Sequence, residues 1–379
     1  MANLKILRQG ELRSSVAVVV GTRPGIIKMT PVVRGLQKLR VPFFLIHTGQ
    51  HYSYNMDRQF FEELDLPRPR FHGRGVSKCR LHGEQTAEMI KGVERALLQE
   101  RPQIIVVGGD ANTNFAGAVA GRKLGIGVAH VEAGLRSYDS RMPEEHNRVM
   151  IDHISDFLFP PTPSDKANLL RERVRGQIWV TGNTIVDAVR EQAELSLWKS
   201  RILQDIGLGE GQPYLLLTVH REENVDTQKN LGRITEAISQ LFRSFGLPII
   251  FPIHPRTRNR LRLFGLESKL LAVPSVRVIP GVGYLDFLRL LQGTQLVLTD
   301  SGGIQEEACC LKIACVTLRD NTERPETVRV GANKIAGLEP ADVVKSAHEM
   351  LGKQGHWKNP LGDGKAGLRI ARVLSKSLR

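Results

Sequence analysis

The chain has 379 residues, a length typical of two domains. Of these residues, 41% are hydrophobic and 24% are charged, a composition typical of a globular protein. No apolar run reaches the ~20 residues that a membrane helix needs, and no apolar signal core opens the sequence, so we expect no membrane partner and a cytoplasmic protein. The formal charge of +14 comes from Lys and Arg spread along the chain without a nucleic-acid-binding motif, which favours a solvated basic surface or a site for a small phosphate-bearing substrate over a nucleic acid.

Through the first half of the chain, short apolar runs alternate with segments that suit helices. Such runs, rich in β-branched residues, are typical of strands buried on both faces of a parallel sheet. The predicted strands are 16–20, 43–46, 104–107, 128–131, 157–159 and 178–180. The predicted helices are 26–38, 59–64, 84–99, 115–124 and 144–154, and the basic segment 68–80 is predicted to be a loop.

The same alternation resumes near Pro213, with predicted strands at 214–219, 249–253, 276–279, 296–298 and 314–318. The pattern predicts an α/β fold with two Rossmann-like doubly wound domains facing a central cleft. We expect an N-terminal domain over 1–190 and a C-terminal domain over 191–362. The remaining segment, 363–379, contains a basic amphipathic helix that we expect to pack back on the first domain.

The turn Ser301-Gly302-Gly303 lies between a predicted strand and a predicted helix. Glycines without Cβ let a ligand approach the backbone, and the unsatisfied N–H groups at a helix start attract anions. Glu306 and Glu307 follow in the first helical turns, within reach of a sugar hydroxyl. The turn therefore indicates either the binding site of a nucleotide diphosphate or an ordinary strand-to-helix turn with a serine cap.

Polar side chains follow most of the predicted strands. In an open α/β sheet, ligands bind beyond the carboxyl ends of the strands. The residues concerned are Arg23, Gln50, Asp110, Glu132, Asn183, His220, His254 and the segment 319–326. Acids, imidazoles and guanidiniums of this kind suit acid–base chemistry on a phosphate-bearing substrate. We expect no metal, and the four cysteines, which have no metal-ligand spacing, are predicted to be core thiols of a reducing compartment.

These residues also have structural alternatives. Asp110 suits a helix cap, and Glu132 suits a buried ion pair with Arg136 or Arg148. His220 suits a satisfied core histidine.

Cations at the start of a helix oppose its dipole, so Arg23 and Lys28 favour a bound anion. Arg324 stands between two glutamates and suits a surface ion pair. The glycine spacings of dinucleotide-binding and P-loop motifs are missing from the sequence, which argues against hydride transfer and nucleotide hydrolysis.

Taken together, these motifs make the chain resemble the non-hydrolysing UDP-N-acetylglucosamine 2-epimerases. They occur in the family's order from about residue 16 to 340. The matching stretches are Gly21-Thr22-Arg23-Pro24 with Lys28, Thr48-Gly49-Gln50-His51, Gly109-Asp110, 130–136, 143–148, Gly182-Asn183-Thr184, His220-Arg221, 299–307 and 319–326.

The resemblance implies a glycosyltransferase-B-like architecture, a homodimer and a UDP-sugar substrate. It also implies that UDP-N-acetylglucosamine and UDP-N-acetylmannosamine interconvert by inversion at C2, without a cofactor. In that mechanism, UDP is first eliminated to leave a 2-acetamidoglucal, and it adds back after C2 is reprotonated on the other face.

The resemblance also carries roles onto residues of this sequence. Asp110, Glu132 and Glu144 match the catalytic carboxylates, and His220 matches the catalytic histidine. The residues implied in binding the UDP-sugar are Arg23, Lys28, Phe287, Ser301, Gly302, Gly303, Glu307 and Arg324.

The sequence departs from the family pattern at a few positions. Gly25 replaces the usual Glu, Ala111-Asn112 follows Asp110 where many members have Thr, and 50–53 lack the residues of a second, regulatory UDP-sugar site. The alternatives to the epimerase are a hydrolysing enzyme that releases ManNAc and UDP, an epimerase of a modified UDP-hexosamine, a retaining glycosyltransferase, and a non-enzymatic UDP-sugar-binding protein.

Overall fold

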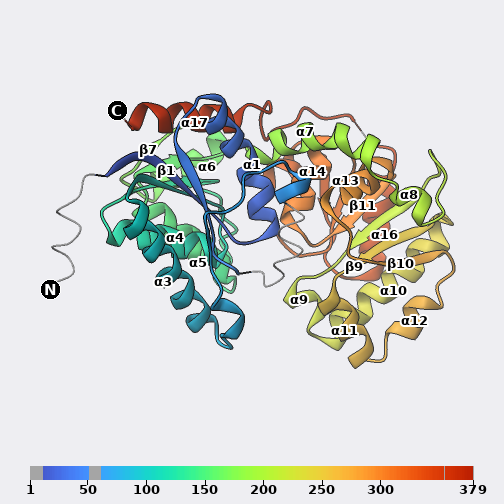
Figure 1. Cartoon of the computed structure of the whole chain (residues 1–379). Coiled ribbons are helices and arrows are strands. Elements are labelled where there is room, and N and C mark those ends of the chain that lie inside the picture. Colours follow the sequence, from blue (N-terminus) through green and yellow to red (C-terminus); the bar gives the residue numbers. More distant parts are fainter. Residues whose placement is uncertain (1–11, 51–60, 354, 379) are drawn as a thin grey trace. The chain divides into compact units, whose positions relative to one another are not determined.

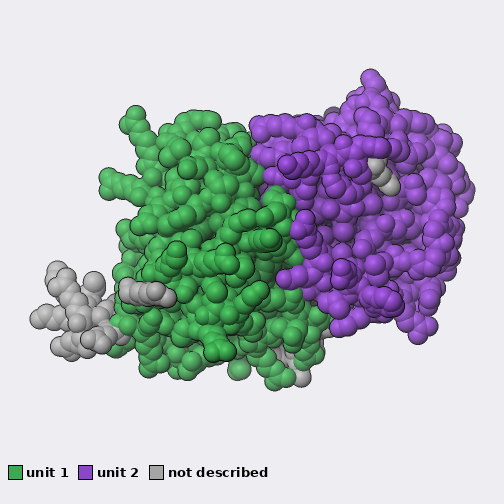
Figure 2. All heavy atoms as spheres, turned by 90° about the horizontal axis from the view of Figure 1, so that it is seen from above, with its two compact units in different colours: residues 1–188, 362–379 green, residues 189–361 purple. Residues whose placement is uncertain are grey.

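The computed structural model describes residues 12–50, 61–353 and 355–378. The chain divides into two compact units: unit 1 comprises 1–188 and 362–379, and unit 2 comprises 189–361 (Figures 1 and 2). Each unit is built on its own parallel sheet with helices on both faces. Among the described residues, no helix is long and apolar enough to cross a bilayer.

Unit 1 contains a parallel sheet in the spatial order β3-β2-β1-β4-β5-β6-β7. Its strands are β1 (Arg13–Val20), β2 (Phe43–His47), β3 (Phe71–His72), β4 (Pro102–Gly108), β5 (Gly127–Val131), β6 (Phe157–Phe159) and β7 (Gln177–Ile178). Its helices are α1 (Arg23–Lys38), η3 (Val76–Lys78), α3 (His82–Glu100), α4 (Asn112–Lys123), α5 (Pro143–Ile154), α6 (Pro163–Arg171) and α17 (Ala366–Ser377). The order of the strands reverses between β1 and β4, and such a switch point is where open α/β sheets bind ligands.

The core of unit 1 explains its apolar strands. Val16, Val18 and Val19 of β1 and Ile105 of β4 are fully buried, because helices cover both faces of the sheet. A strand in that position has no solvated face, so its sequence is continuously apolar rather than alternating.

The C-terminal helix α17, red in Figure 1, packs against α1 of the same unit. The two backbones approach so closely that a Cβ on Gly367 would lie 2.3 Å from the carbonyl oxygen of Pro31. Asp187 caps α17 by accepting from the N–H groups of Ala366 and Gly367, at 3.2 and 3.0 Å. The last helix is therefore an integral part of unit 1.

Unit 2 contains a second parallel sheet, in the order β10-β9-β8-β11-β12-β13. Its strands are β8 (Leu215–Thr218), β9 (Ile249–Ile253), β10 (Val276–Pro280), β11 (Leu296–Thr299), β12 (Cys315–Thr317) and β13 (Asn333–Ile335). Its helices are α8 (Ile202–Asp205), α9 (Glu222–Val225), α10 (Gln228–Phe245), α11 (Pro255–Leu263), α12 (Glu267–Leu271), α13 (Tyr284–Gly293), α14 (Gly302–Leu311), α15 (Pro325–Arg329) and α16 (Pro340–Met350). Helix α7 (Thr184–Lys199) begins in unit 1 and ends in unit 2.

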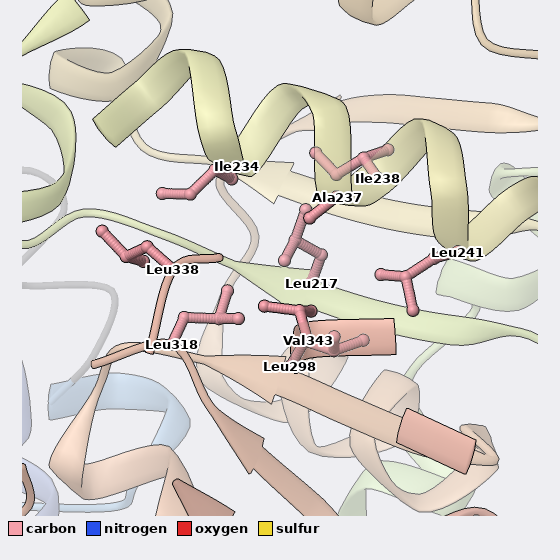
Figure 3. A pocket seen from close by; sticks show the side chains of 9 residues that line it. All are labelled: Leu217, Ile234, Ala237, Ile238, Leu241, Leu298, Leu318, Leu338 and Val343. Atoms are coloured by element: carbon pink, nitrogen blue, oxygen red, sulfur yellow. The ribbon is translucent and has the colours of Figure 1, made fainter. Parts of the chain in front are cut away.

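A small cavity of ≈ 10 Å³ lies in the core of unit 2 (Figure 3). Its lining is entirely aliphatic: Ile234, Ala237, Ile238 and Leu241 of α10 face Leu217, Leu298, Leu318, Leu338 and Val343. A space of this size and polarity offers a water molecule no partners and a sugar no room. We assign it to imperfect core packing and not to a ligand site.

The predicted α/β class with doubly wound parallel sheets is confirmed, and the differences are local. The predicted loop 68–80 contains the two-residue strand β3 and the single-turn helix η3, which are too short to leave a periodic signal. The last predicted strand of unit 1, 178–180, is instead Gln177–Ile178. Part of the predicted helix 59–64 and the motif residue His51 lie outside the described residues.

Candidate active site

The first candidate carboxylate, Asp110, follows the Gly108-Gly109 turn at the end of β4. Arg148 of α5 donates to Oδ2 of Asp110 from both Nε and Nη2, at 2.9 and 2.6 Å. The same guanidinium also donates to Glu145. The Arg148 side chain is only 4% exposed, whereas the Asp110 side chain is 31% exposed. A buried arginine thus holds a carboxylate that remains accessible to a ligand.

The helix-cap alternative for Asp110 is wrong. Helix α4 begins at Asn112, and its N-cap residue, Ala111, has no capping side chain. The side chain of Gln50 caps the helix instead, because its Oε1 accepts from the N–H and the hydroxyl of Thr113 at 2.9 and 2.8 Å.

The second candidate carboxylate, Glu132, lies at the end of β5 and is 4% exposed. Lys28 Nζ donates to both of its oxygens, at 2.7 and 3.0 Å, and Asn183 Nδ2 donates to Oε1 at 3.2 Å. Glu132 has a φ of +67°, a conformation that costs energy in a residue with a Cβ. Such strained backbone is concentrated at functional sites.

The ion-pair partner of Glu132 differs from the expected Arg136 or Arg148. Arg136 instead pairs with Asp152 at 2.8 Å and with Glu172 at 2.5 Å, while Arg148 is held by Asp110. The cation that reaches Glu132 is Lys28, from the second turn of α1. Lys28 therefore has a local anionic partner already, and its position at a helix start does not by itself require a bound anion.

The other first-unit candidates lie at helix N-termini. Glu144 is half-buried in the first turn of α5, where the helix dipole favours a carboxylate. Arg23 is half-buried at the start of α1, whose N-cap Thr22 accepts from Gly25 N–H at 3.2 Å. The first turn of α1 contains no acidic residue.

In unit 2, Asp300 organises the ends of β8 and β11. It is 0% exposed and accepts from the backbone N–H groups of His220 and Arg221, at 3.0 and 2.9 Å, and from Asn224 Nδ2 at 3.0 Å. His220 Nδ1 lies 3.1 Å from Oδ1 of Asp300. Burial alone would raise the pKa of Asp300, but the hydrogen bonds from His220 and Arg221 outweigh it and hold this pKa below its usual range.

The core alternative for His220 is wrong, because its side chain is 40% exposed. One ring nitrogen is engaged by Asp300, which fixes the orientation of the imidazole. This is how a positioned acid or base is held in many enzymes.

The Ser301-Gly302-Gly303 turn leads from β11 into α14. Ser301 occupies the N-cap position, but its side chain makes no capping hydrogen bond, so the serine-cap alternative is wrong. The first turn of α14 contains no acidic residue. A Cβ on Gly303 would find Ser301 Oγ as its nearest described neighbour, at 3.9 Å, so the space beside this turn is open.

The remaining second-unit candidates are Arg324, Glu307 and Phe287. Arg324 is 6% exposed, pairs with Glu306 and donates to the Glu323 carbonyl at 3.1 Å, so it is a buried ion pair and not a surface one. Glu307 is 7% exposed and lies beside Tyr284 on α13; burial and this carboxylate raise the pKa of Tyr284 well above its usual value. Phe287, also on α13, packs half-buried against the core.

Among the described residues, no three His, Cys, Asp or Glu side chains gather as a metal site. Each unit instead presents partnered acids and bases at the carboxyl ends of its strands. Such an arrangement can move protons and bind a phosphate group.

Comparison with known proteins identifies the family. The family model described as UDP-N-acetylglucosamine 2-epimerase matches residues 36–375. The chain belongs to the UDP-N-acetylglucosamine 2-epimerase family. The UDP-N-acetylglucosamine 2-epimerase of Methanocaldococcus jannaschii is 49% identical, over 95% of this chain and 98% of the relative. The UDP-2,3-diacetamido-2,3-dideoxy-D-glucuronate 2-epimerase of Pseudomonas aeruginosa is 38% identical, over 95% of this chain and 99% of the relative.

Solved structures of the epimerase family support the assignment of the fold. The crystal structure of the M. jannaschii UDP-GlcNAc 2-epimerase in complex with UDP-GlcNAc and UDP matches with a TM-score of 0.90, over 96% of this chain and 99% of that chain. The glycosyltransferase-B-like class expected from the sequence is confirmed.

Sequence reasoning missed several residues that organise the strand ends of each unit. Arg148 and Asp300 lay inside matching motifs, yet their roles depend on partners that are 38 and 80 residues away in the chain. His130 and Asp152 were missed as a pair, with their ring nitrogen and carboxylate oxygen 2.6 Å apart and both side chains fully buried. A buried histidine in an apolar strand was the available signal.

Proposed function

We propose that this chain interconverts UDP-N-acetylglucosamine and UDP-N-acetylmannosamine by inversion at C2 of the sugar. The observation that carries the proposal is the pair of cation-held carboxylates, Asp110 with Arg148 and Glu132 with Lys28, at the strand ends of a chain that belongs to this epimerase family. The 49% identity to the M. jannaschii enzyme over nearly the whole length supports the same reaction.

The chemistry needs proton transfer at a carbon that is not acidic. Loss of UDP from C1 together with the C2 proton gives a 2-acetamidoglucal, so no free carbanion forms. A proton then adds to the opposite face of C2, and UDP adds back at C1. Asp110, Glu132 and Glu144 are the candidates for these transfers, since carboxylates in unlike surroundings can differ in proton affinity.

UDP departure places negative charge on the diphosphate. We assign its stabilisation to His220 and Arg23, with Lys28 contributing while it also balances Glu132. The amide groups of Ser301, Gly302 and Gly303 would hold the phosphates, Glu307 the ribose hydroxyls, and Phe287 the uracil. The buried ion pair of Arg324 with Glu306 supports a role in shaping this turn in addition to adding positive charge.

We also propose that the protein is a cytoplasmic homodimer that needs no cofactor, as the family resemblance implies. An epimerase for a modified UDP-hexosamine is the second candidate. The 38% identity to the diacetamido-glucuronate 2-epimerase of P. aeruginosa favours testing it directly.

The decisive experiment is NMR of UDP-GlcNAc incubated with the protein in D2O. We expect deuterium at C2 and the appearance of UDP-ManNAc. Free ManNAc and UDP would indicate the hydrolysing enzyme, and turnover of only the diacetamido substrate would indicate the second candidate. Folded protein that binds UDP but exchanges no C2 hydrogen on any of these sugars would overturn the proposal. Asp110→Asn and Glu132→Gln variants serve as matched controls, expected to bind UDP without exchange.

A further inference from the structure

The segment that carries Asp110 is held by side chains along its whole backbone. Asn114 Nδ2 donates to the Gly108 carbonyl at 2.6 Å, and Asn147 Nδ2 donates to the Asp110 carbonyl at 2.9 Å. Between them, the Gly109 carbonyl lies 3.1 Å from Nε2 of His130. Each carbonyl from 108 to 110 thus has a side-chain partner, so contacts with side chains elsewhere in the unit fix the backbone conformation of this turn.

His130 lies on β5 and is 0% exposed. Its Nδ1 is 2.6 Å from Oδ1 of Asp152, and its Nε2 faces the Gly109 carbonyl. A carbonyl oxygen can only accept a hydrogen bond, and so can an ionised carboxylate. If Asp152 is ionised, both ring nitrogens of His130 must carry a proton, and the ring is an imidazolium.

The surroundings of Asp152 require it to be ionised. Its second oxygen, Oδ2, accepts from the Gly134 N–H at 3.1 Å and lies 2.8 Å from Nη2 of Arg136. Burial would raise the pKa of Asp152, but its contacts with His130 and Arg136 outweigh burial and lower this pKa. Both oxygens therefore act as acceptors.

The buried charges alternate along one chain of contacts. Glu172 binds Arg136 through two hydrogen bonds, at 2.8 and 2.5 Å, Arg136 contacts Asp152, and Asp152 contacts His130. Each buried charge is balanced by a neighbour of opposite sign, which is the condition under which buried ions are tolerated. The chain ends at the peptide that precedes Asp110.

The other side of that peptide faces Glu132. Gly109 has a φ of +86°, and a Cβ at this position would lie 3.2 Å from Oε2 of Glu132. Glu132 itself stands two residues after His130, at the end of the same strand. The Gly109 peptide is therefore enclosed by His130 and Glu132, and its orientation affects both candidate carboxylates.

We propose that His130 and Asp152 are positioning residues: His130, fixed by Asp152 and donating from its other ring nitrogen to the Gly109 carbonyl, locks the Gly109 peptide and thereby sets the geometry between Asp110 and Glu132. The catalytic half of this inference rests on the proposed function, because it assigns the two carboxylates to proton transfer. A misplacement of about 1 Å at such groups is worth on the order of 10²-fold in rate.

The protonation state is tested in the wild-type protein without any substrate. NMR of protein labelled with ¹⁵N-histidine, with the His130 signals assigned by their loss in His130→Asn, should show two protonated ring nitrogens on His130 at neutral pH. A neutral-tautomer pattern would overturn the proposal. This measurement decides the protonation state of His130 even if the protein proves to have another activity, because it requires no catalysis.

The positioning role is tested with His130→Asn and Asp152→Asn, which keep polarity but remove the charge. We expect kcat and C2 deuterium exchange to fall about 100-fold, with UDP affinity within about twofold of wild type, since the UDP contacts are assigned to other residues. Asp187→Asn is the matched control, because it removes a buried charge from the same unit at the α17 cap and should lower stability without lowering kcat.

Unchanged kcat in folded His130→Asn would overturn the positioning role, and so would an equal loss of kcat in Asp187→Asn. If neither His130→Asn nor Asp152→Asn folds, the His130 signals of the wild type are assigned through their backbone connectivities, and the spectrum still decides the protonation state of His130. Absence of epimerase activity in the wild type, together with a His130 protonated on both ring nitrogens, would contradict the proposed function but not the inferred hydrogen bonds of His130.

Discussion

Lys28 donates to both oxygens of Glu132, so that an amine from α1 and a carboxylate from the end of β5 form one buried ion pair. The pair joins residues that are 104 positions apart in the chain. Its side chains are 11% and 3% exposed, which means that neither charge is balanced by bulk water.

Removal of Lys28 alone should therefore be more damaging than removal of the pair. We expect Lys28→Met to cost about 3–5 kcal/mol of unfolding free energy, because it leaves Glu132 buried without its counter-charge. The double variant with Glu132→Gln should recover most of that loss while remaining inactive. Urea unfolding of the single and double variants measures the difference. A double variant no more stable than Lys28→Met would contradict this account.

A methyl group at Gly303 should separate binding from stability. The Cβ of Gly303→Ala has open space beside it, and Ala is favoured over Gly in a helix by up to about 1 kcal/mol, so stability should hold or rise. The methyl group would nevertheless occupy the approach to the turn, and we expect UDP affinity to fall at least about tenfold, or ~1.4 kcal/mol.

Calorimetric titration with UDP checks this result against a matched control. Gly232→Ala lies in α10, where a Cβ would meet nothing within 4 Å, and it should give a similar stability with unchanged UDP affinity. Equal UDP affinity in both variants would mean that the 301–303 turn is not the diphosphate site.

Asp300 should make part of the stability depend on pH. Its pKa is lowered in the folded state, so the stability that it contributes is complete above the unfolded aspartate value of about 3.9 and is lost as the pH falls through the folded value. We expect Asp300→Asn to be less stable than wild type at neutral pH and to lose less further stability below pH ~4. Denaturant unfolding across that range measures both slopes, and parallel slopes would show that Asp300 does not contribute.

The contact between α17 and α1 should not tolerate a side chain at Gly367. A Cβ there would lie 2.3 Å from the Pro31 carbonyl oxygen, so Gly367→Ala must push the helices apart, at a cost of about 1–3 kcal/mol. Gly92→Ala in α3 is the control, because a Cβ at Gly92 has nothing within 4 Å, and it should stabilise by roughly 0.5–1 kcal/mol. Thermal unfolding compares the two, and a Gly367→Ala variant as stable as wild type would be the contrary result.

Strands that are buried on both faces could be predicted from the sequence, because burial requires a run of apolar residues. Strands β1 and β4 are covered on both faces, so their apolar runs were visible, and the polar residues that follow them were visible as candidates. The start of α1 was placed at residue 26 instead of Arg23, because Thr22-Arg23-Pro24-Gly25 reads as a turn. In the structure, Thr22 is the N-cap and proline lies in the first helical turn, where its missing N–H costs nothing.

Ion pairs and hydrogen bonds between side chains far apart in the chain could not be predicted from the sequence. The choice of Lys28 over Arg136 or Arg148 for Glu132 depends on how α1 and α5 lie against the sheet. Local periodicity contains no information about that arrangement. For the same reason, His130 was visible as a polar residue in a strand, but its link to Asp152 was not.

The return of the last helix to unit 1 has a consequence for biosynthesis. Unit 2 is one uninterrupted stretch, 189–361, so its contacts do not depend on any later part of the chain. Unit 1 is made first but must wait for Ala366–Ser377, whose buried Ile370, Ala371 and Leu374 finish its packing. A chain that lacked Ala366–Ser377 would leave the face of α1 that α17 covers exposed to water, so this loss would damage the unit whose first part is synthesised earliest.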